Sequence, residues 1–253
     1  MNDFTLVAYT ELLDALIEQG YSFQTFEQFI KSPQPRSVIL RHDVDARAHN
    51  SRDFARVQAK RGVVGTYYFR AIPQSWDEDI VREMVSYGHE IGYHYECLTT
   101  CGGNIHKALQ DFAFNLENFR KVCAITTICM HGSPMSKYDS RDLWKHSSYR
   151  DYGIMAEPYF DVDYSKVFYL TDTGRRWDGE KFSVRDKVNS TFDLQFHTTQ
   201  EIIRSCMSGQ LPDCIMFTFH PQRWTDNRVQ WTVEWVIQRI KNVVKRAFFM
   251  RKK

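Results

Sequence analysis

Apolar positions follow two different periods along this chain, and the two alternate from segment to segment. Residues 9–17 carry apolar side chains at the i, i+3, i+4, i+7 and i+8 spacing of a helix, and Gly20 ends this pattern. Short apolar runs then predict strands, and amphipathic segments between them predict helices. These runs are SVILRH (37–42), GTYYFR (65–70), EIGYHY (90–95) and AITTICM (124–130). The alternation predicts a mainly parallel sheet covered by helices.

The second half of the chain continues this pattern after a less regular stretch. Residues 139–190 are rich in Tyr, Asp and Arg, and element boundaries there are weakly defined. Beyond them, FDLQFH (192–197) and CIMFTFHPQRW (214–224) predict strands on either side of a helix, and a last helix bears Trp235, Val236, Ile240, Val243 and Ala247. Roughly seven strands and seven helices indicate a barrel or a doubly wound sheet.

Composition narrows the class of protein. A chain of 253 residues, 43% of them hydrophobic, can bury a full core. The 33 basic and 31 acidic residues nearly balance, so we expect no nucleic-acid partner.

The N-terminus carries acids instead of a basic leader, and no apolar run approaches the roughly 18 residues of a membrane span, so a cytoplasmic protein is expected. Six cysteines form no CxxC pair and are expected to be buried thiols.

Polar residues gather at the ends of the predicted strands, in RHDVD, HYE, HGSP, DTGRRW and HPQRW. Ligands bind at the carboxyl ends of the strands in parallel α/β folds, so these groups should meet at one mouth. Asp43 and Asp45 are two residues apart and would point to the same side of an extended chain. His94 and Glu96 repeat that spacing, and the set suits zinc or a similar divalent ion.

Each of these motifs also has a purely structural interpretation. Asp43 and Asp45 could form Asx turns or cap the following helix. His94 could be a hydrogen-bonded core histidine, and HPQRW could be a turn with an aromatic anchor. A plain surface role is equally compatible with Arg175 and Arg176.

Taken together and in order, LRHDVD, GTYYF, GHEIGYHYE, HGSP and FTFHP resemble the successive motifs of the polysaccharide deacetylase superfamily, the NodB-like carbohydrate esterases. The resemblance covers about residues 37–222. It implies an α/β single-domain distorted (β/α) barrel of about seven strands, with a helical extension at 1–36 and a C-terminal helix and basic tail at 223–253. It also implies a metal-dependent hydrolase that removes an N-acyl group, such as acetyl, from an amino sugar.

The resemblance also assigns roles to individual residues. It makes Asp43 the catalytic base, Asp45 and His94 metal ligands, and His220 the general acid. The expected ion is zinc, with cobalt, nickel or manganese as alternatives. Val44 between the two acids is a departure from the commonest form, in which they are adjacent.

A second departure concerns the metal site. The family's second metal histidine should lie four residues after His94, where this chain has Leu98. Glu96 is the nearest replacement with ligand chemistry, and His131 in HGSP is another that could reach the same mouth. A third alternative is that no metal binds and the protein is a degenerate relative.

DTGRRW corresponds loosely to a family segment that orients the base and lines the substrate site. Arg175 or Arg176 could pair there with a phosphate or carboxylate on the sugar, and Trp177 could stack on its ring. Arg41 could keep Asp43 ionised. The full set expected to bind substrate is Arg41, Asp172, Arg175, Arg176, Trp177 and Arg223.

The chain more closely resembles a branch of the superfamily encoded among bacterial surface-polysaccharide genes, including those of O-antigen assembly. This implies a nucleotide-linked or lipid-linked sugar made in the cytoplasm as substrate. The tail KNVVKRAFFMRKK, with six Lys and Arg residues, either rests peripherally on an anionic inner membrane or is a solvated helix end. Two other functions stay open: a non-catalytic sugar-binding or scaffold relative, and a metal hydrolase of a different amide or ester.

Overall fold

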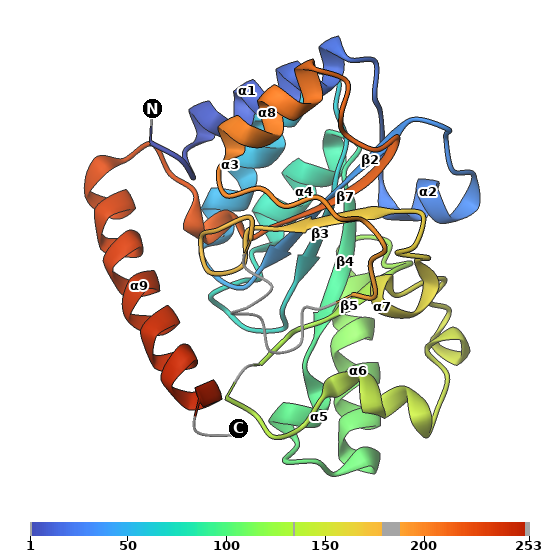
Figure 1. The fold of residues 1–253 in the computed structure, drawn as a ribbon. Helices are drawn as coiled ribbons and strands as arrows, with labels where there is room; N and C mark the ends of the chain where they lie inside the picture. The colour runs from blue at the N-terminus through green and yellow to red at the C-terminus, as the bar shows by residue number, and fades with distance from the viewer. Residues whose placement is uncertain (1, 134, 179–187, 251–253) are drawn as a thin grey trace.

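The computed structural model of the protein describes residues 2–133, 135–178 and 188–250, with the backbone alone for 245–250. Within these ranges one sheet forms, and all of its paired strands are parallel (Figure 1). Their order is β5-β4-β3-β2-β7-β6, and β1 also pairs with β2. The strands are β1 (Ser22–Gln24), β2 (Ser37–Val44), β3 (Thr66–Phe69), β4 (Glu90–Tyr95), β5 (Ile128–Met130), β6 (Phe168–Thr171) and β7 (Cys214–Phe219).

β2 lies in the middle of the sheet, and its sequence SVILRHDV accounts for that position. All of its residues are buried, as expected for a parallel strand covered on both faces. One edge of β2 pairs with β7 over residues 37–42, and the other edge is shared by β1 at 37–39 and β3 at 41–44. The segment predicted as a helical extension, 1–36, therefore also supplies a strand to the sheet.

Helices cover the sheet and connect its strands (Figure 1). α1 packs against α8 and α3, and α3 packs against α4. Side chains cap several of the helices at their first turn: Thr25 and Thr198 form capping boxes, and Asp77 and Asn104 accept from backbone amides. The helices are α1 (Leu6–Glu18), α2 (Phe26–Lys31), α3 (Ala48–Ala59), α4 (Glu78–Ser86), α5 (Cys97–Thr100), α6 (Ile105–Arg120), α7 (Pro158–Asp161), α8 (Thr199–Met207) and α9 (Arg228–Met250), with short 3₁₀ turns η1 (Ser140–Lys145), η2 (Tyr149–Tyr152) and η4 (Pro221–Arg223).

The alternation of side chains along each strand divides the interior into two apolar clusters. Val38, Leu40 and Val44 of β2 belong to the larger cluster, which the helices cover. Ile39 belongs to a smaller cluster on the other face, together with Tyr68, Cys129, Tyr169 and Met216 from the neighbouring strands. Arg41 and Asp43 follow Ile39 at two-residue intervals, so they lie on the same face of the sheet as Ile39 and the smaller cluster.

The predicted fold class, a single α/β domain built as a distorted (β/α) barrel of about seven strands, is confirmed. One predicted strand is wrong: FDLQFH at 192–197 forms no regular strand. Its alternating apolar residues have another cause, because Phe196 is buried and Phe192 and Leu194 pack on the larger cluster as an irregular segment. β1, only three residues long, was not predicted.

Candidate metal centre and active site

The carboxyl end of β2 carries a buried ion pair. Arg41 is 1% exposed, and its Nε and Nη2 atoms donate to the two carboxylate oxygens of Asp43 at 2.9 and 2.7 Å. Burial raises the pKa of Asp43, but the guanidinium and the nearby imidazoles of His94 and His220 outweigh this and hold that pKa below its usual value. Asp43 is therefore ionised at neutral pH. Arg41 is engaged with Asp43 and too buried to reach a substrate.

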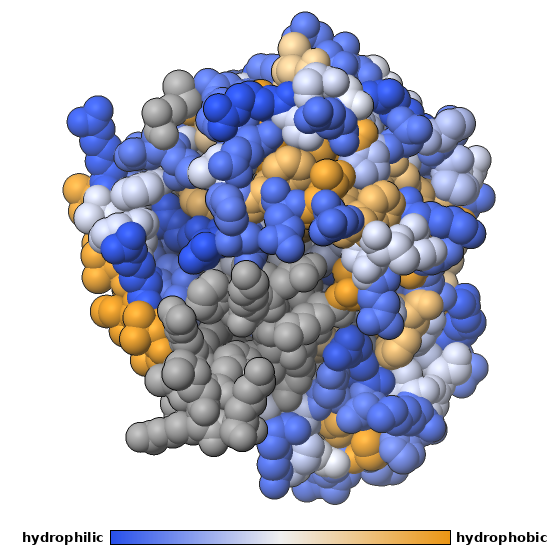
Figure 2. All heavy atoms as spheres, in the orientation of Figure 1, coloured by the Kyte–Doolittle hydropathy of each residue, from blue (hydrophilic) through white to orange (hydrophobic). Residues whose placement is uncertain are grey.

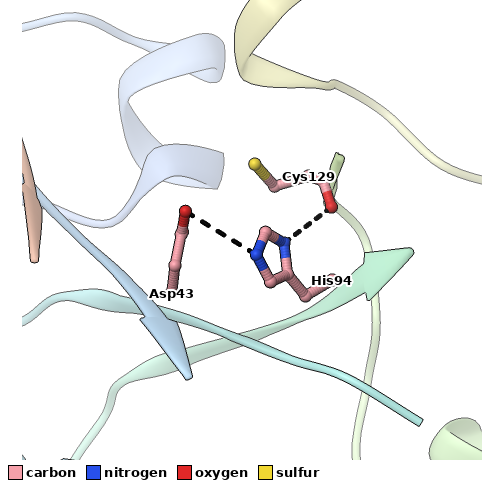
Figure 3. Close-up of side chains that lie close together, drawn as sticks. All are labelled: Asp43, His94 and Cys129. Carbon is pink, nitrogen blue, oxygen red and sulfur yellow. Dashed lines mark hydrogen bonds and ion pairs between the residues drawn. The ribbon is translucent and has the colours of Figure 1, made fainter. Parts of the chain in front are cut away.

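His94 approaches Asp43 from the neighbouring part of the sheet. It lies near the end of β4, where the small Gly92 leaves room for the ring of Tyr68 on the same face. The Nδ1 atom of His94 lies 2.9 Å from the carbonyl oxygen of Cys129, and its Nε2 atom faces Asp43 at 3.7 Å (Figure 3). A carbonyl accepts only from N–H, so Nδ1 carries the proton in the neutral ring, and in that tautomer Nε2 offers a lone pair to a metal ion.

Three side chains converge immediately beyond the strand ends: Asp45 after β2, His94 on β4 and His131 after β5. Oδ1 of Asp45 lies 3.6 Å from Nε2 of His94 and 3.4 Å from Nε2 of His131. Ligands about 2.0–2.1 Å from a tetrahedral zinc ion are separated by roughly 3.3 Å, so these separations fit a shared ion. Oδ1 of Asp45 is also buried with no hydrogen-bond partner among the described residues. The donor set and this orphaned oxygen both fit a divalent cation.

The carboxylate of Asp45 is ionised as well. Burial raises its pKa, but His94 and His131 outweigh that effect and hold the pKa well below its usual value. Its second oxygen, Oδ2, accepts from Nε2 of Gln222 at 2.9 Å. This bond fixes the carboxylate and leaves Oδ1 directed at the two imidazoles.

Glu96 lies behind His131 and outside the group of three. Its Oε2 atom is 2.8 Å from Nδ1 of His131, while Oε1 accepts from Nη2 of Arg70 at 2.6 Å. Burial raises the pKa of Glu96, but His131 and Arg70 lower it to about 2. A carboxylate on the far nitrogen of a histidine orients the ring and fixes its tautomer. Glu96 thus holds His131 in place, which is a different role from the ligand role predicted for it.

Leu98, four residues after His94, takes no part in this group of possible ligands. It lies on the short helix α5, is 4% exposed and belongs to the larger apolar cluster. A residue at this position packs in the core, and His131 enters the site from β5 instead. The amide of His131 donates to the carbonyl of Tyr95 at 2.8 Å, which aligns the two strand ends.

A second group of possible ligands overlaps the first and consists of Asp43, His94 and Cys129 (Figure 3). Both oxygens of Asp43 already accept from Arg41, whereas Oδ1 of Asp45 accepts from none of the described groups. Binding a cation through Asp43 would compete with a buried guanidinium. The group of Asp45, His94 and His131 is therefore the better cation site.

His220 follows β7, and a network of hydrogen bonds holds it. Its Nδ1 atom lies 2.5 Å from Oδ1 of Asp172, and Asp172 also accepts from Arg223 at 3.1 Å and from the indole of Trp224 at 2.6 Å. Burial raises the pKa of Asp172, but His220 and then Arg223 outweigh it, so the pKa is lowered. The predicted substrate residues Asp172 and Arg223 thus form the support of His220.

The structure brings together most of the predicted site residues, but the DTGRRW segment does not line the site as expected. Trp177 is 3% exposed, packs between Phe217 and Phe219, and donates its N–H to Thr199, so its ring is part of the core. Arg175 is 7% exposed and donates to the carbonyl of Trp231 on α9. Trp177 is therefore too buried to stack on a sugar, and Arg175 is too buried to pair with an anion, in contrast to both predictions.

Arg176 is the exposed member of this segment. It pairs with Asp178 at 2.7 Å, on a carboxylate that His197 also contacts. The charge of Arg176 is thus matched locally at the surface.

Two residues that sequence reasoning missed support the site. Arg70, at the end of β3, joins Glu96 to the backbone carbonyl of Asp45, and Gln222 fixes Asp45. Both follow predicted strands, in GTYYFR and HPQRW, so their position at strand ends was the available signal. An open cavity of about 470 Å³ adjoins the group, and its lining includes Glu96, His131, Ser133, Lys137 and Tyr138.

No helix among the described residues is long and apolar enough to cross a membrane. The basic tail predicted to meet a membrane falls mostly outside the description, since the side chains of 245–250 and all of 251–253 are not described. Pro134 of the HGSP motif also lies outside it.

No protein-family model and no curated protein matches the chain. Two solved structures are similar to it over 90% of its length. One is the family 4 carbohydrate esterase PdaA from Bacillus subtilis, with 13% identity, 83% of that chain covered and a TM-score of 0.46. The other is a family 4 carbohydrate esterase from Bacillus anthracis, with 12% identity, 84% coverage and a TM-score of 0.42. At these values the likeness is too weak to assign an activity.

Proposed function

We propose that this protein is a metal-dependent hydrolase that removes an N-acyl group, such as acetyl, from an amino sugar. One observation carries the proposal: Asp45, His94 and His131, whose ligand atoms lie close enough together to hold a cation, are beside an ionised Asp43 and a carboxylate-supported His220. The ordered motifs from LRHDVD to FTFHP support the substrate class. Amide hydrolysis needs an electrophile, a base and an acid, and this strand edge offers candidates for all three.

The residues that would hold the ion are Asp45, His94 and His131. Two imidazoles and one carboxylate suit zinc, with cobalt, nickel or manganese as alternatives, and leave a coordination position open. When bound, such an ion polarises an amide carbonyl and lowers the pKa of a water molecule. Gln222 and Glu96 orient Asp45 and His131 for this purpose.

Asp43 would act as the general base. Its carboxylate faces His94 and is held ionised by Arg41, so it can accept a proton from the attacking water at neutral pH. The fixed bidentate contact with Arg41 also prevents the carboxylate from rotating toward the cation. Asp43 and Asp45 would thereby keep separate roles, although only Val44 lies between them.

His220 would act as the general acid. Nδ1 is bonded to Asp172, so Nε2 is the atom that can deliver a proton to the departing amine nitrogen. Asp172 stabilises the protonated imidazole and fixes the ring. In the complete reaction, the water oxygen would bond to the acyl carbon as Asp43 takes the water proton. The C–N bond would then break as His220 protonates the nitrogen, leaving a carboxylate and a free amino sugar.

We further propose a nucleotide-linked or lipid-linked amino sugar of surface-polysaccharide synthesis as the substrate. The likeness of the motif series to the surface-polysaccharide branch of the superfamily supports this choice. The cavity beside His131 would accept the acyl-bearing sugar, and Lys137 at its wall offers a cation for a phosphate group.

Metal binding and product release together test the proposed function. Purified protein should bind one zinc or cobalt ion in a calorimetric titration, and the loaded protein should release acetate from at least one member of a panel of N-acetylated nucleotide sugars and oligosaccharides. Absence of stoichiometric zinc, cobalt, nickel or manganese would refute a metal hydrolase and favour a sugar-binding relative. Release of acid from esters or other amides, but from no N-acyl sugar, would replace the substrate class.

A further inference from the structure

The last described helix, α9, turns its polar side toward the protein and its apolar side toward solvent. Glu234 and Gln238 on the inner side are 8% and 5% exposed. Ile240 and Val243 on the outer side are 60% and 69% exposed. An amphipathic helix on a soluble domain normally buries its apolar stripe, so this orientation is reversed.

Specific contacts fix the inner side. Glu234 forms a salt bridge of 3.5 Å with Arg47, and Asn242 donates to the carbonyl of Gly174 at 3.0 Å. Trp231 donates its indole N–H to the carbonyl of Asp3 at 2.7 Å. These bonds oppose a rotation of α9 that would hide its apolar side against the body of the protein. They also join α9 to the loop that carries Asp172.

The outer side forms one continuous apolar face. We name it the α9 apolar face and define it as Val229, Val233, Val236, Ile240 and Val243, which recur at intervals of four and three residues and are 43–73% exposed. Ile237 and Val244 extend it along one border. In Figure 2 apolar side chains gather along the edge of the molecule that α9 occupies in Figure 1. Contiguous exposed apolar surface of this kind marks an interaction site.

Positive charge borders this face. With about 100° between successive helical residues, Arg228 and Arg239 lie roughly 80–100° to one side of its centre, and Lys241 lies about 120° to the other. Arg239 stacks over the ring of Trp235 at 4.0 Å. The one acid among residues 228–244, Glu234, is turned inward. An apolar centre flanked by cations and an aromatic residue is the pattern of a helix lying in a membrane interface.

We propose that the α9 apolar face docks α9 onto an anionic membrane surface, lying parallel to it. The cations would meet lipid phosphates while the valines and Ile240 enter the acyl boundary. The flanking positive charge favours a membrane over a second copy of the chain as the partner. Two copies paired through this face would bring the flanking arginines of both helices to the seam without an acidic side chain to match them.

Vesicle flotation of the full chain tests the proposal. The protein should bind vesicles of phosphatidylcholine mixed with phosphatidylglycerol, bind phosphatidylcholine alone much more weakly, and lose affinity as salt rises. Val233→Glu or Ile240→Glu should each lower the partition coefficient roughly tenfold or more, since an acid replaces a branched apolar side chain that would enter the acyl boundary. Phe114→Glu, at a 64% exposed position on α6, is the matched control and should bind normally.

Arg239→Gln combined with Lys241→Gln separates charge from apolar contact. This variant should bind anionic vesicles less tightly than wild type at low salt and approach it at high salt. The proposal is overturned if wild type fails to float with anionic vesicles, or if Phe114→Glu loses as much binding as Ile240→Glu. It is equally overturned if light scattering finds a dimer that Ile240→Glu dissociates but that anionic vesicles do not.

Discussion

His131 and Asp45 come from strands that lie on different sides of His94, yet their Nε2 and Oδ1 atoms are 3.4 Å apart. Asp45 follows β2, and His131 follows β5 at the edge of the sheet. His94 lies on β4, between these two strands in the order of the sheet. His131 therefore completes a group of three possible ligands in which Leu98, packed in the core, takes no part.

The first prediction compares a proposed metal ligand, His131, with the residue that orients it, Glu96. His131→Ala should lower zinc affinity more than Glu96→Gln, for which a loss of about 10- to 100-fold is expected from the loss of the contact that orients His131. Cys129→Ala should leave affinity unchanged, because Asp43 is committed to Arg41. Calorimetric zinc titration of the three variants measures this. Wild-type affinity in His131→Ala would move the cation away from this group, and a loss in Cys129→Ala would favour the alternative set.

The second prediction concerns the base. Asp43→Asn should reduce turnover by roughly 10²–10⁴-fold while zinc binding is retained, because Asp43 lies beside the cation group without belonging to the preferred set. The same change leaves the buried charge of Arg41 without its carboxylate, so the free energy of unfolding should fall by about 3–5 kcal/mol. Zinc titration at a temperature well below the unfolding midpoint shows that the variant is folded. Wild-type turnover in Asp43→Asn would remove Asp43 as the base.

The third prediction concerns the support of the acid. Asp172→Asn should lower kcat by roughly 10²–10⁴-fold, since an amide cannot stabilise a protonated His220 through Nδ1. Zinc affinity should stay at its wild-type value, because Asp172 is not one of the three ligands. Arg223→Gln keeps the carboxylate on His220 and should have a smaller effect on kcat. Equal losses in the two variants would show that the network only maintains the fold.

The sequence predicted the strand ends well because buried strands follow simple periods. Asp43 and His94 lie within regular strands and face each other, as their positions predicted. Asp45 lies just past the end of β2, where its amide donates to the carbonyl of Asp43 at 3.1 Å, so strand alternation does not account for its position. Glu96 was expected to project from the same side of the strand as His94, but β4 ends at Tyr95, and Glu96 is the N-cap residue of α5, with φ of −140° and ψ of 22°. The two-residue rule holds only while the strand continues.

Other parts of the site depend on contacts between distant segments. The approach of His131 requires the register of β4 and β5, in which Tyr95 lies opposite Met130. Trp177 was predicted at the site because DTGRRW closes a predicted strand and corresponds loosely to a family segment that lines the substrate site. Its large apolar ring instead packs among Phe4, Phe217 and Phe219. Burial of an indole outweighs its position at a strand end, and local sequence contains no information on that competition.

The last prediction tests two core histidines that lie outside the proposed chemistry. His42 is fully buried: Nδ1 lies 3.1 Å from the carbonyl of Thr66, and Nε2 lies 3.1 Å from the side-chain amide of Gln58. The amide of Gly65 donates to Nδ1 of His89 at 3.2 Å, and Nε2 of His89 faces the carbonyl of Ala55 at 3.1 Å. Each ring thus needs one unprotonated nitrogen. Burial lowers the pKa of His42 to about 3 and that of His89 to about 4.

Because both pKa values are lower in the folded than in the unfolded state, the unfolded chain binds more protons as pH falls below about 6.5. Stability is therefore full above that pH and is lost toward pH 4, by roughly 1.4 kcal/mol per pH unit for each histidine. Urea unfolding at several pH values between 7.5 and 4.5 measures the slope. His89→Gln should remove about half of the contribution of these two residues, and His106→Gln, at an exposed position on α6, should leave the slope unchanged. An identical slope in wild type and His89→Gln would show that His89 is protonated in the folded protein.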